Sequence, residues 1–319
     1  MKIAIVTPAP PRARNGNRVT AERWRRILRK IGHDVSIVLP EADADAAVLI
    51  AVHARKSHGA IERFHTRFPE RPVIVALAGT DLSEDFVTQG ARRSQVLASL
   101  GIARWIIALH PLVAVEVPLD YRDRVRVILQ SAVPLAHPPE RSQRHLDMVV
   151  VGHLRPVKDP FLPARALQWL PARSRVRIVH YGRALDPSML EAVRAAMASD
   201  PRYLWKGEQP RGEVRQGIAR AHALIHPSIA EGGANTVSEA LVLGTPVLAS
   251  AIPGNLGLLG LDYPGVFPVG DAEALARLLL RFEAEPLFRA ILRERCEAIG
   301  ERHRPEVELE AWKRLLADL

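Results

Sequence analysis

"KIAIVTPAPPRARNGNRVTAERWRRILRKIGHDVSIVL", residues 2–39, contains two short apolar runs with a longer amphipathic run between them. The apolar run 2–6 is typical of a buried strand, and so is the run 34–39. Between them, over 17–32, apolar residues recur every three or four positions and a glycine ends the segment, which predicts a helix. A strand, a helix and a second strand in this order indicate one repeating unit of a parallel sheet.

The same alternation extends along the chain, with one interruption. It predicts further strands at 46–54, 72–79, 103–109 and 124–129. The pattern stops over 133–146, which holds three prolines, several charges and no periodicity, as expected of a linker. It then restarts, with strands predicted at 147–152, 175–180, 223–226 and 246–250.

We therefore expect an α/β protein with two Rossmann-like domains facing a central cleft. The N-terminal domain is predicted to span 1–135 and the C-terminal domain 147–303, with 136–146 as the linker. The terminal helix, 304–319, can pack back on the first domain. Within the second domain, helices are predicted near 160–170, 186–198, 211–221, 236–243 and 271–283.

Composition narrows the class of protein. The chain has 319 residues, a formal net charge of +9 and one cysteine, Cys296. A single cysteine allows no intramolecular disulfide, so we expect a cytoplasmic protein. The first apolar run is too short for a signal peptide, and no run approaches the roughly 18 apolar residues that span a bilayer. That lack of a long apolar run also leads us to expect no stable membrane insertion. Aromatic residues make up only 5%, so we expect no nucleic-acid partner.

The segment "EGGANTVSEA", residues 231–240, carries the clearest chemistry. It places Glu231 and Glu239 eight positions apart, with Gly232 and Gly233 after the first glutamate. Asn235 is a good helix cap, so we predict that a helix begins there. The glycines let a ligand approach the backbone, and the N–H groups at the helix start favour an anion. Because a carboxylate can accept hydrogen bonds from a vicinal diol, we predict a site for a charged, hydroxyl-rich ligand.

This segment resembles the signature of the retaining glycosyltransferases of family 4, which have two Rossmann-like domains (the GT-B fold). The continuation "EALVLGTPVLAS" (239–250) fits that family closely. The resemblance implies that Glu231 contacts the sugar of a nucleotide-sugar donor and that Glu239 contacts the nucleotide ribose.

A second family element is "GHLRPVKD", residues 152–159. The family has an arginine and a lysine here that bind the donor diphosphate. Lys158 matches that lysine, His153 replaces the arginine, and Asp159 replaces the last glycine; Arg155 is the expected substitute cation. The donor-binding candidates are Gly16, His153, Gly232, Gly233, Ala234, Asn235, Thr236 and Glu239.

The loops that follow the N-terminal strands are rich in cations and are expected to converge at one sheet edge. In "TPAPPRARNGNRVT" (7–20), Gly16 matches the glycine-rich loop of the family and Arg14 adds a cation nearby. The acceptor-binding candidates lie in these loops: Arg12, Asn15, Asn17, Arg18, His53, Arg55, Lys56, Thr80, Asp81 and His110. So many cations favour a small anionic acceptor.

The whole chain also resembles a narrower family, the selenosugar synthases of selenoneine biosynthesis. The segments that carry this resemblance are "TPAPPRARNGNRVTAERW", "VALAGTDL", "VVGHLRPVKDP", "EGGANTVSEA" and "GLLGLDYPGVFPVGD". It implies UDP-N-acetylglucosamine or a related UDP-sugar as donor, selenophosphate as acceptor, and a carbon–selenium bond at the anomeric carbon. Lys158, Arg155 and Glu231 are then the expected catalytic residues. Because Lys158 and Arg155 neutralise the leaving diphosphate, we expect no metal and no other cofactor.

Three other classes of function stay open at this point. One is an ordinary family 4 glycosyltransferase that uses a lipid or small-molecule hydroxyl acceptor at a membrane surface, and another is a UDP-sugar epimerase of the same fold. The third is a nucleic-acid binder. An Asp-x-Asp sequence at 43–45 is interpreted as part of a loop, and the first strand is not followed by the G-x-G-x-x-G of dinucleotide-binding dehydrogenases.

Overall fold

The computed structural model describes residues 1–13, 15–81, 85, 88 and 90–319. The chain forms two compact units. Unit 1 comprises Met1–Ser131, Glu231–Ala234 and Pro305–Leu319, and unit 2 comprises Ala132–Ala230 and Asn235–Arg304. Each unit contains a six-stranded sheet whose paired strands are parallel. The prediction of an α/β protein with two Rossmann-like domains is confirmed.

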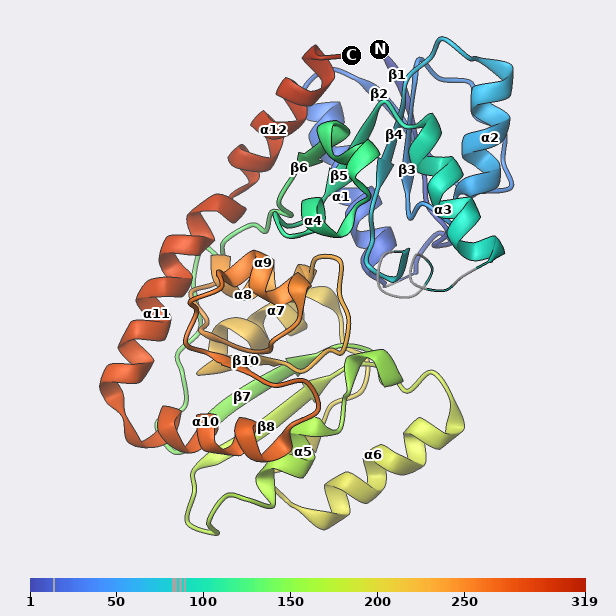
Figure 1. Cartoon of the computed structure of the whole chain (residues 1–319). Coiled ribbons are helices and arrows are strands. Elements are labelled where there is room, and N and C mark those ends of the chain that lie inside the picture. The colour runs from blue at the N-terminus through green and yellow to red at the C-terminus, as the bar shows by residue number, and fades with distance from the viewer. Residues whose placement is uncertain (14, 82–84, 86–87, 89) are drawn as a thin grey trace. The chain divides into compact units, whose positions relative to one another are not determined.

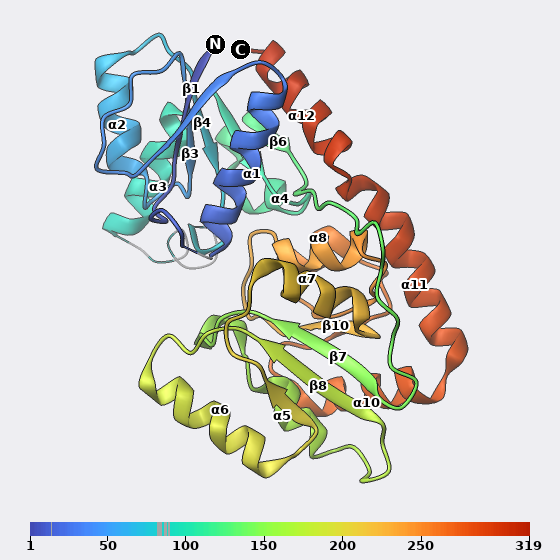
Figure 2. The same ribbon diagram turned by 180° about the vertical axis from the view of Figure 1, so that it is seen from behind.

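Unit 1 has the strand order β2-β1-β3-β4-β5-β6. Its strands are β1 (Lys2–Val6), β2 (Asp34–Val38), β3 (Val48–Val52), β4 (Val73–Ala76), β5 (Trp105–Ala108) and β6 (Val125–Val127). Its helices are α1 (Gly16–Lys30), α2 (His58–Arg67), α3 (Ala91–Ile102), α4 (Val113–Glu116) and α12 (Pro305–Ala317), with a 3-10 turn at Leu119–Arg124. Helices α1 and α12 cover one face of the sheet, and α2 and α3 cover the other (Figures 1 and 2).

The terminal helix α12 is anchored to α1 by buried aromatic and charged side chains. The rings of Trp24 and Trp312 meet edge to face, with centroids 4.9 Å apart. Beside them, the buried Glu308 accepts hydrogen bonds from Arg23 Nε at 3.1 Å and Trp24 Nε1 at 2.8 Å. The backbone N–H of Ser131 donates to the same carboxylate at 2.8 Å. These contacts place α12, which ends the chain, in the same compact unit as β1, which begins it.

Unit 2 has the strand order β12-β11-β10-β7-β8-β9. Its strands are β7 (Leu146–Val151), β8 (Val176–Tyr181), β9 (Tyr203–Trp205), β10 (Ala223–His226), β11 (Val247–Ser250) and β12 (Val266–Phe267). Its helices are α5 (Leu162–Leu167), α6 (Pro187–Ser199), α7 (Arg211–Arg220), α8 (Asn235–Val242), α9 (Pro253–Leu259), α10 (Ala272–Ala284) and α11 (Pro286–Gly300). Helices α5, α6 and α10 lie on one face of the sheet, and α7, α8 and α9 lie on the other (Figures 1 and 2).

Among the elements that the sequence pattern did not predict are β9, β12 and α9. It also moves two helix starts. Asn235, predicted as the cap of α8, is the first helical residue. Gly16, predicted to lie in a loop, opens α1, whose cap is Asn15; the side chain of Asn15 accepts a hydrogen bond from the Arg18 N–H at 3.1 Å. The prediction that Asn235 caps α8 is therefore wrong by one residue, whereas α1 has an asparagine cap that was not predicted.

Candidate functional site

In unit 2 the loop that leaves β7 is tied to the loop that leaves β8. Strands β7 and β8 pair in register up to Val151 and Tyr181, so the residues that follow them emerge side by side. The Gly152 N–H donates to Tyr181 O at 2.9 Å, and the Leu154 N–H donates to Arg183 O at 2.9 Å. In return, the Arg183 N–H donates to His153 Nδ1 at 3.1 Å. The loop 152–159 is therefore well ordered at its start.

Lys158 ends a short 3-10 turn, Pro156–Lys158, within this loop. Its side-chain stem passes over Gly152: a Cβ added to that glycine would lie 3.9 Å from Lys158 Cγ. Lys158 is half-buried and Arg155 is exposed, so the two predicted cations share one loop at the carboxyl edge of the sheet. Asp159 adopts φ +39°, in the left-handed region. Glycine adopts this backbone most easily, and aspartate is one of the other residues that tolerate it.

Glu239 lies in the second turn of α8, which follows β10. Its side chain is only 12% exposed, and its Oε1 accepts a hydrogen bond from Arg211 Nη2 at 2.9 Å. Arg211 opens α7 and is more than half exposed. The sequence did not single out Arg211, since an exposed arginine 28 positions from its partner leaves no local pattern. In the same helix, Thr236 Oγ1 lies 3.4 Å from His226 Nδ1.

The segment Glu231–Ala234 groups with unit 1 rather than with the helix that follows it. Gly232 packs on Gly79 so closely that a Cβ at residue 232 would lie 2.3 Å from the Gly79 backbone nitrogen. Gln130 Nε2 donates to Gly233 O at 2.7 Å. The two glycines therefore permit close backbone packing in unit 1, and Glu231 is half-buried beside them.

His53 is the most constrained acceptor-binding candidate in unit 1. It directly follows β3, is almost fully buried, and adopts φ +75°, which strains a residue other than glycine. Its Nε2 lies 2.9 Å from Thr80 Oγ1, after β4. Burial lowers the pKa of His53, and the nearby carboxylates of Asp81 and Asp85 oppose this shift in part. His53 and Thr80 thus meet at the carboxyl edge of two neighbouring strands.

Asp81 and His110 are both buried next to this pair of strands. Asp81 has no exposed surface and accepts hydrogen bonds from the N–H groups of Ala54, Ala78 and Gly79 at 2.8–3.1 Å. Asp81 therefore holds the backbone of the loops that follow β3 and β4. His110 follows β5 in unit 1, and its Nδ1 is buried with no hydrogen-bond partner among the described residues. Burial lowers its pKa to about 4.

The four described candidate cations of unit 1 differ in their surroundings. Arg18 is paired with Glu22 along α1, and Arg55 Nε lies 2.7 Å from Asp85 Oδ2. Arg12 and Lys56 are exposed. Asn17 lies in the first turn of α1, and Arg14 lies outside the described residues. Two of these cations therefore already face a carboxylate.

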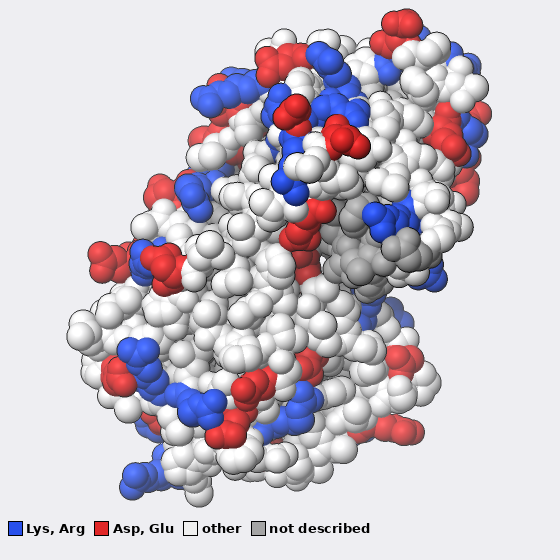
Figure 3. All heavy atoms as spheres, in the orientation of Figure 1, with Lys and Arg blue, Asp and Glu red and all other residues white. Residues whose placement is uncertain are grey.

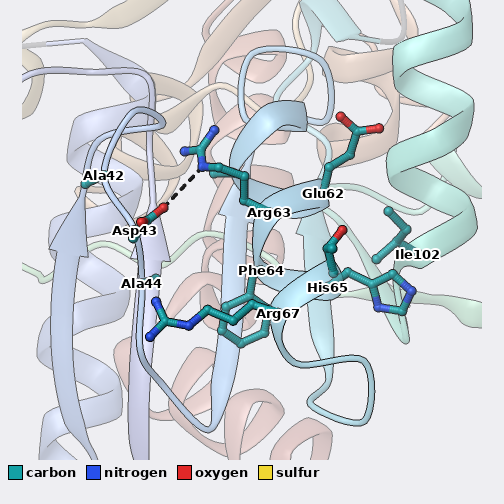
Figure 4. A pocket seen from close by; sticks show the side chains of 11 residues that line it. Ala42, Asp43, Ala44, Glu62, Arg63, Phe64, His65, Arg67 and Ile102 are labelled. Atoms are coloured by element: carbon teal, nitrogen blue, oxygen red, sulfur yellow. Dashed lines mark hydrogen bonds and ion pairs between the residues drawn. The ribbon is translucent and has the colours of Figure 1, made fainter.

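A pocket of about 650 Å³ lies away from these residues, between the 42–44 loop and the last turns of α2 (Figure 4). It is at the amino edge of the sheet, because residues 42–44 precede β3. Asp43 Oδ1 lies 3.2 Å from Arg63 Nε across it, and Asp45 pairs with Arg71 at 2.9 Å. The Asp-x-Asp sequence therefore lies in a loop and pairs with arginines.

On the face shown in Figure 3, lysine and arginine side chains are interspersed with aspartate and glutamate. Within the described part of the chain, no group of three or more histidine, cysteine, aspartate or glutamate residues could hold a metal ion. The expectation that no metal is required stays a prediction.

Of the helices formed by the described residues, none is both long and apolar enough to cross a membrane.

Comparison with known proteins gives consistent matches. The family model "Glycosyl transferases group 1" matches residues 138–303. The chain is 26% identical to glycosyltransferase 1 domain-containing protein 1 of Xenopus tropicalis over 337 residues, covering 97% of this chain and 96% of that protein. Two solved structures cover 100% of both chains: Anabaena Alr3699/HepE in complex with UDP and glucose (14% identity, TM-score 0.79) and sucrose-phosphate synthase from Thermosynechococcus elongatus (15% identity, TM-score 0.78).

Proposed function

Because the chain belongs to the glycosyl transferases of group 1, we propose that it transfers a sugar, N-acetylglucosamine, from a UDP-sugar to selenophosphate. The observation that carries the donor half of this proposal is the loop after β7. There Lys158 and Arg155 lie together at the carboxyl edge of a parallel sheet, where such folds bind ligands. Similar folds are found in complex with UDP and with UDP-glucose in Anabaena HepE, which supports UDP as the carrier.

Each donor-binding residue has a defined task in this proposal. Lys158 and Arg155 neutralise the charge that develops on the leaving diphosphate. Glu239 accepts hydrogen bonds from the two ribose hydroxyls in place of the one from Arg211, whose guanidinium is more than half exposed and is solvated by water when released. Glu231 contacts the sugar. Charge neutralisation by side chains lets the transfer proceed without a metal.

The acceptor half rests on unit 1 and on the resemblance to selenosugar synthases. Arg12 and Lys56 supply exposed positive charge, and His53 with Thr80 supplies hydrogen-bonding groups. A selenium lone pair attacks the anomeric carbon, the carbon–selenium bond forms, and the carbon–oxygen bond to the diphosphate breaks. UDP leaves with that electron pair. Because the nucleophile is already anionic, it needs less help from a general base than a hydroxyl does.

The single cysteine, Cys296, is buried and reduced. We place the protein in the cytoplasm, where thiols stay reduced and where the proposed donor and acceptor are small soluble molecules.

The donor assignment is tested by UDP binding to Glu239→Ala. Loss of the ribose contacts should cost about 1.5–3 kcal/mol of binding free energy, since hydrogen bonds to a charged group are worth that much. Calorimetric titration with UDP measures it. Glu213→Ala, an exposed glutamate in the first turn of α7, is the matched control and should bind UDP as the wild type does. Unchanged UDP affinity in a folded Glu239→Ala protein would mean that Glu239 does not bind UDP.

A further inference from the structure

A buried histidine and a buried tyrosine lie beneath the loop that carries Lys158. His180 is in β8 and Tyr203 is in β9, and both side chains are almost fully shielded from water. His180 Nε2 lies 3.1 Å from Gly152 O, and His180 Nδ1 lies 2.7 Å from the Tyr203 hydroxyl. Neither residue lies in the segments 152–159 and 231–250 that carry the resemblance to family 4.

The chemistry of the contacts fixes which atom donates. A carbonyl oxygen only accepts, so His180 Nε2 carries the proton and donates it to Gly152 O. Nδ1 is then bare and accepts the single proton of the Tyr203 hydroxyl. Burial lowers the pKa of His180 to about 4, so the ring stays neutral and this arrangement holds at physiological pH.

Gly152 is the first residue of the loop that follows β7. Its N–H is held by Tyr181 O and its carbonyl by His180, so both of its backbone polar groups are fixed. Gly182 must approach this carbonyl so closely that a Cβ there would lie 1.7 Å from Gly152 O. The stem of Lys158 lies over Gly152. The far end of the loop is also near the pair, since Pro160 O is 3.5 Å from the Tyr203 hydroxyl.

We propose that His180 and Tyr203 are positioning residues that hold the Gly152 carbonyl and thereby set Lys158 for the donor diphosphate, a role that rests on the function proposed above. They do not touch the substrate. Their effect reaches it through one backbone carbonyl and one lysine side chain. A preorganised cation binds a diphosphate better than one that must first be ordered.

The test uses Tyr203→Phe and a matched control in the same unit, Tyr263→Phe. Tyr263 is also a buried tyrosine, and its hydroxyl donates to Val247 O at 2.8 Å, away from the loop. Both substitutions remove one buried hydroxyl, so both lower stability. Calorimetry with UDP, and competition by uridine against UDP, separate binding of the diphosphate from binding of the nucleoside.

Tyr203→Phe should weaken UDP binding about three- to tenfold more than Tyr263→Phe does, which is the range for one lost neutral hydrogen bond. Uridine affinity should change by less than about twofold, because the loop holds phosphate rather than nucleoside. His180→Gln, which keeps an N–H donor, should retain more UDP affinity than His180→Met, which has none.

The outcomes separate this proposal from the one on which it rests. If Tyr203→Phe weakens UDP no more than Tyr263→Phe, or weakens uridine equally, the pair is merely structural. Lys158→Ala is the reference variant: a large loss of UDP affinity with no effect of Tyr203→Phe would overturn only the positioning role. Unchanged UDP affinity in Lys158→Ala would overturn the diphosphate site itself, and the positioning role with it.

Discussion

Lys56 is exposed and lies three residues after the strained His53. Its exposure limits how much its charge contributes to the binding of an anionic acceptor. If it attracts an anionic acceptor, Lys56→Ala should raise the acceptor KM about two- to fivefold, because a screened surface charge is worth at most about 1 kcal/mol. The donor KM should stay constant, since Lys158, Arg155 and Glu239, the residues proposed to bind the nucleotide, lie in unit 2. Steady-state kinetics with selenophosphate measure both constants.

Lys30→Ala is the matched control for this change. Lys30 ends α1, in the same unit but at the amino edge of the sheet, and is also exposed. Inorganic phosphate should compete with the acceptor in the wild-type enzyme. Equal acceptor KM values for the two variants, together with no competition by phosphate, would remove the electrostatic argument for an anionic acceptor.

At the level of single residues, functional side chains that lie within a short sequence motif could be predicted from the sequence. Side chains that come into contact only in the folded chain could not. Lys158 and Glu239 stand out because each lies in a short ordered motif. His180 and Tyr203 are 23 positions apart, and each looks like an ordinary strand residue, so their contact leaves no signal in the sequence. Asp81 was grouped with possible ligand contacts from its place in a loop, whereas its buried carboxylate accepts backbone N–H groups.

Among the elements, the long periodic segments were predictable and the short ones were not. Strand β9 has three residues and β12 has two, too few for a period to be visible. Helix α9, "PGNLGLL", holds two glycines in seven residues, and glycine lowers helix propensity. These short elements are stabilised by the strands and helices that pack against them. Such long-range contacts cannot be read from the local sequence.

A buried ion pair between Glu308 and Arg23 joins helix α12 to α1. Glu308→Ala leaves the buried guanidinium of Arg23 without its carboxylate partner, a change that costs about 3–5 kcal/mol of unfolding free energy in comparable buried pairs. Chemical denaturation followed by tryptophan fluorescence measures it, because Trp24 and Trp312 lie at this contact.

Glu310→Ala is the control on the same helix, since that side chain is about half exposed and pairs with the exposed cations Lys313 and Arg314. It should change the unfolding free energy by less than about 0.5 kcal/mol. A small effect of Glu308→Ala, equal to that of Glu310→Ala, would mean that α12 does not depend on this carboxylate for its attachment.

For the whole molecule, the burial of two histidines predicts how the free energy of unfolding depends on pH. Burial lowers the pKa of His110 in unit 1 and of His180 in unit 2 to about 4, against about 6.5 in an unfolded chain. Between these values the unfolded chain binds protons that the folded chain does not. Stability should therefore be full above about pH 6.5 and fall toward pH 4, by about 1.4 kcal/mol per pH unit for each histidine.

Glu116 opposes this trend in part, because burial raises its pKa and a raised carboxyl pKa contributes stability that is lost as the pH rises. Thermal unfolding at a series of pH values gives the net dependence. His180→Gln should flatten it, since glutamine does not titrate. Equal unfolding temperatures at pH 4.5 and pH 7 in the wild-type protein would contradict the neutral, buried state of both rings.

We propose that this molecule transfers a sugar from a UDP-sugar to an anionic selenium nucleophile. Mass spectrometry of the products is the most direct test of this proposal, with a panel of UDP-sugars each offered selenophosphate, thiophosphate or phosphate. We predict a product that contains selenium bonded to N-acetylhexosamine, formed together with UDP and only when UDP-N-acetylglucosamine and selenophosphate are both present. UDP-sugar consumed without any selenium-containing product, or selenophosphate left intact with every donor, would contradict the proposed function.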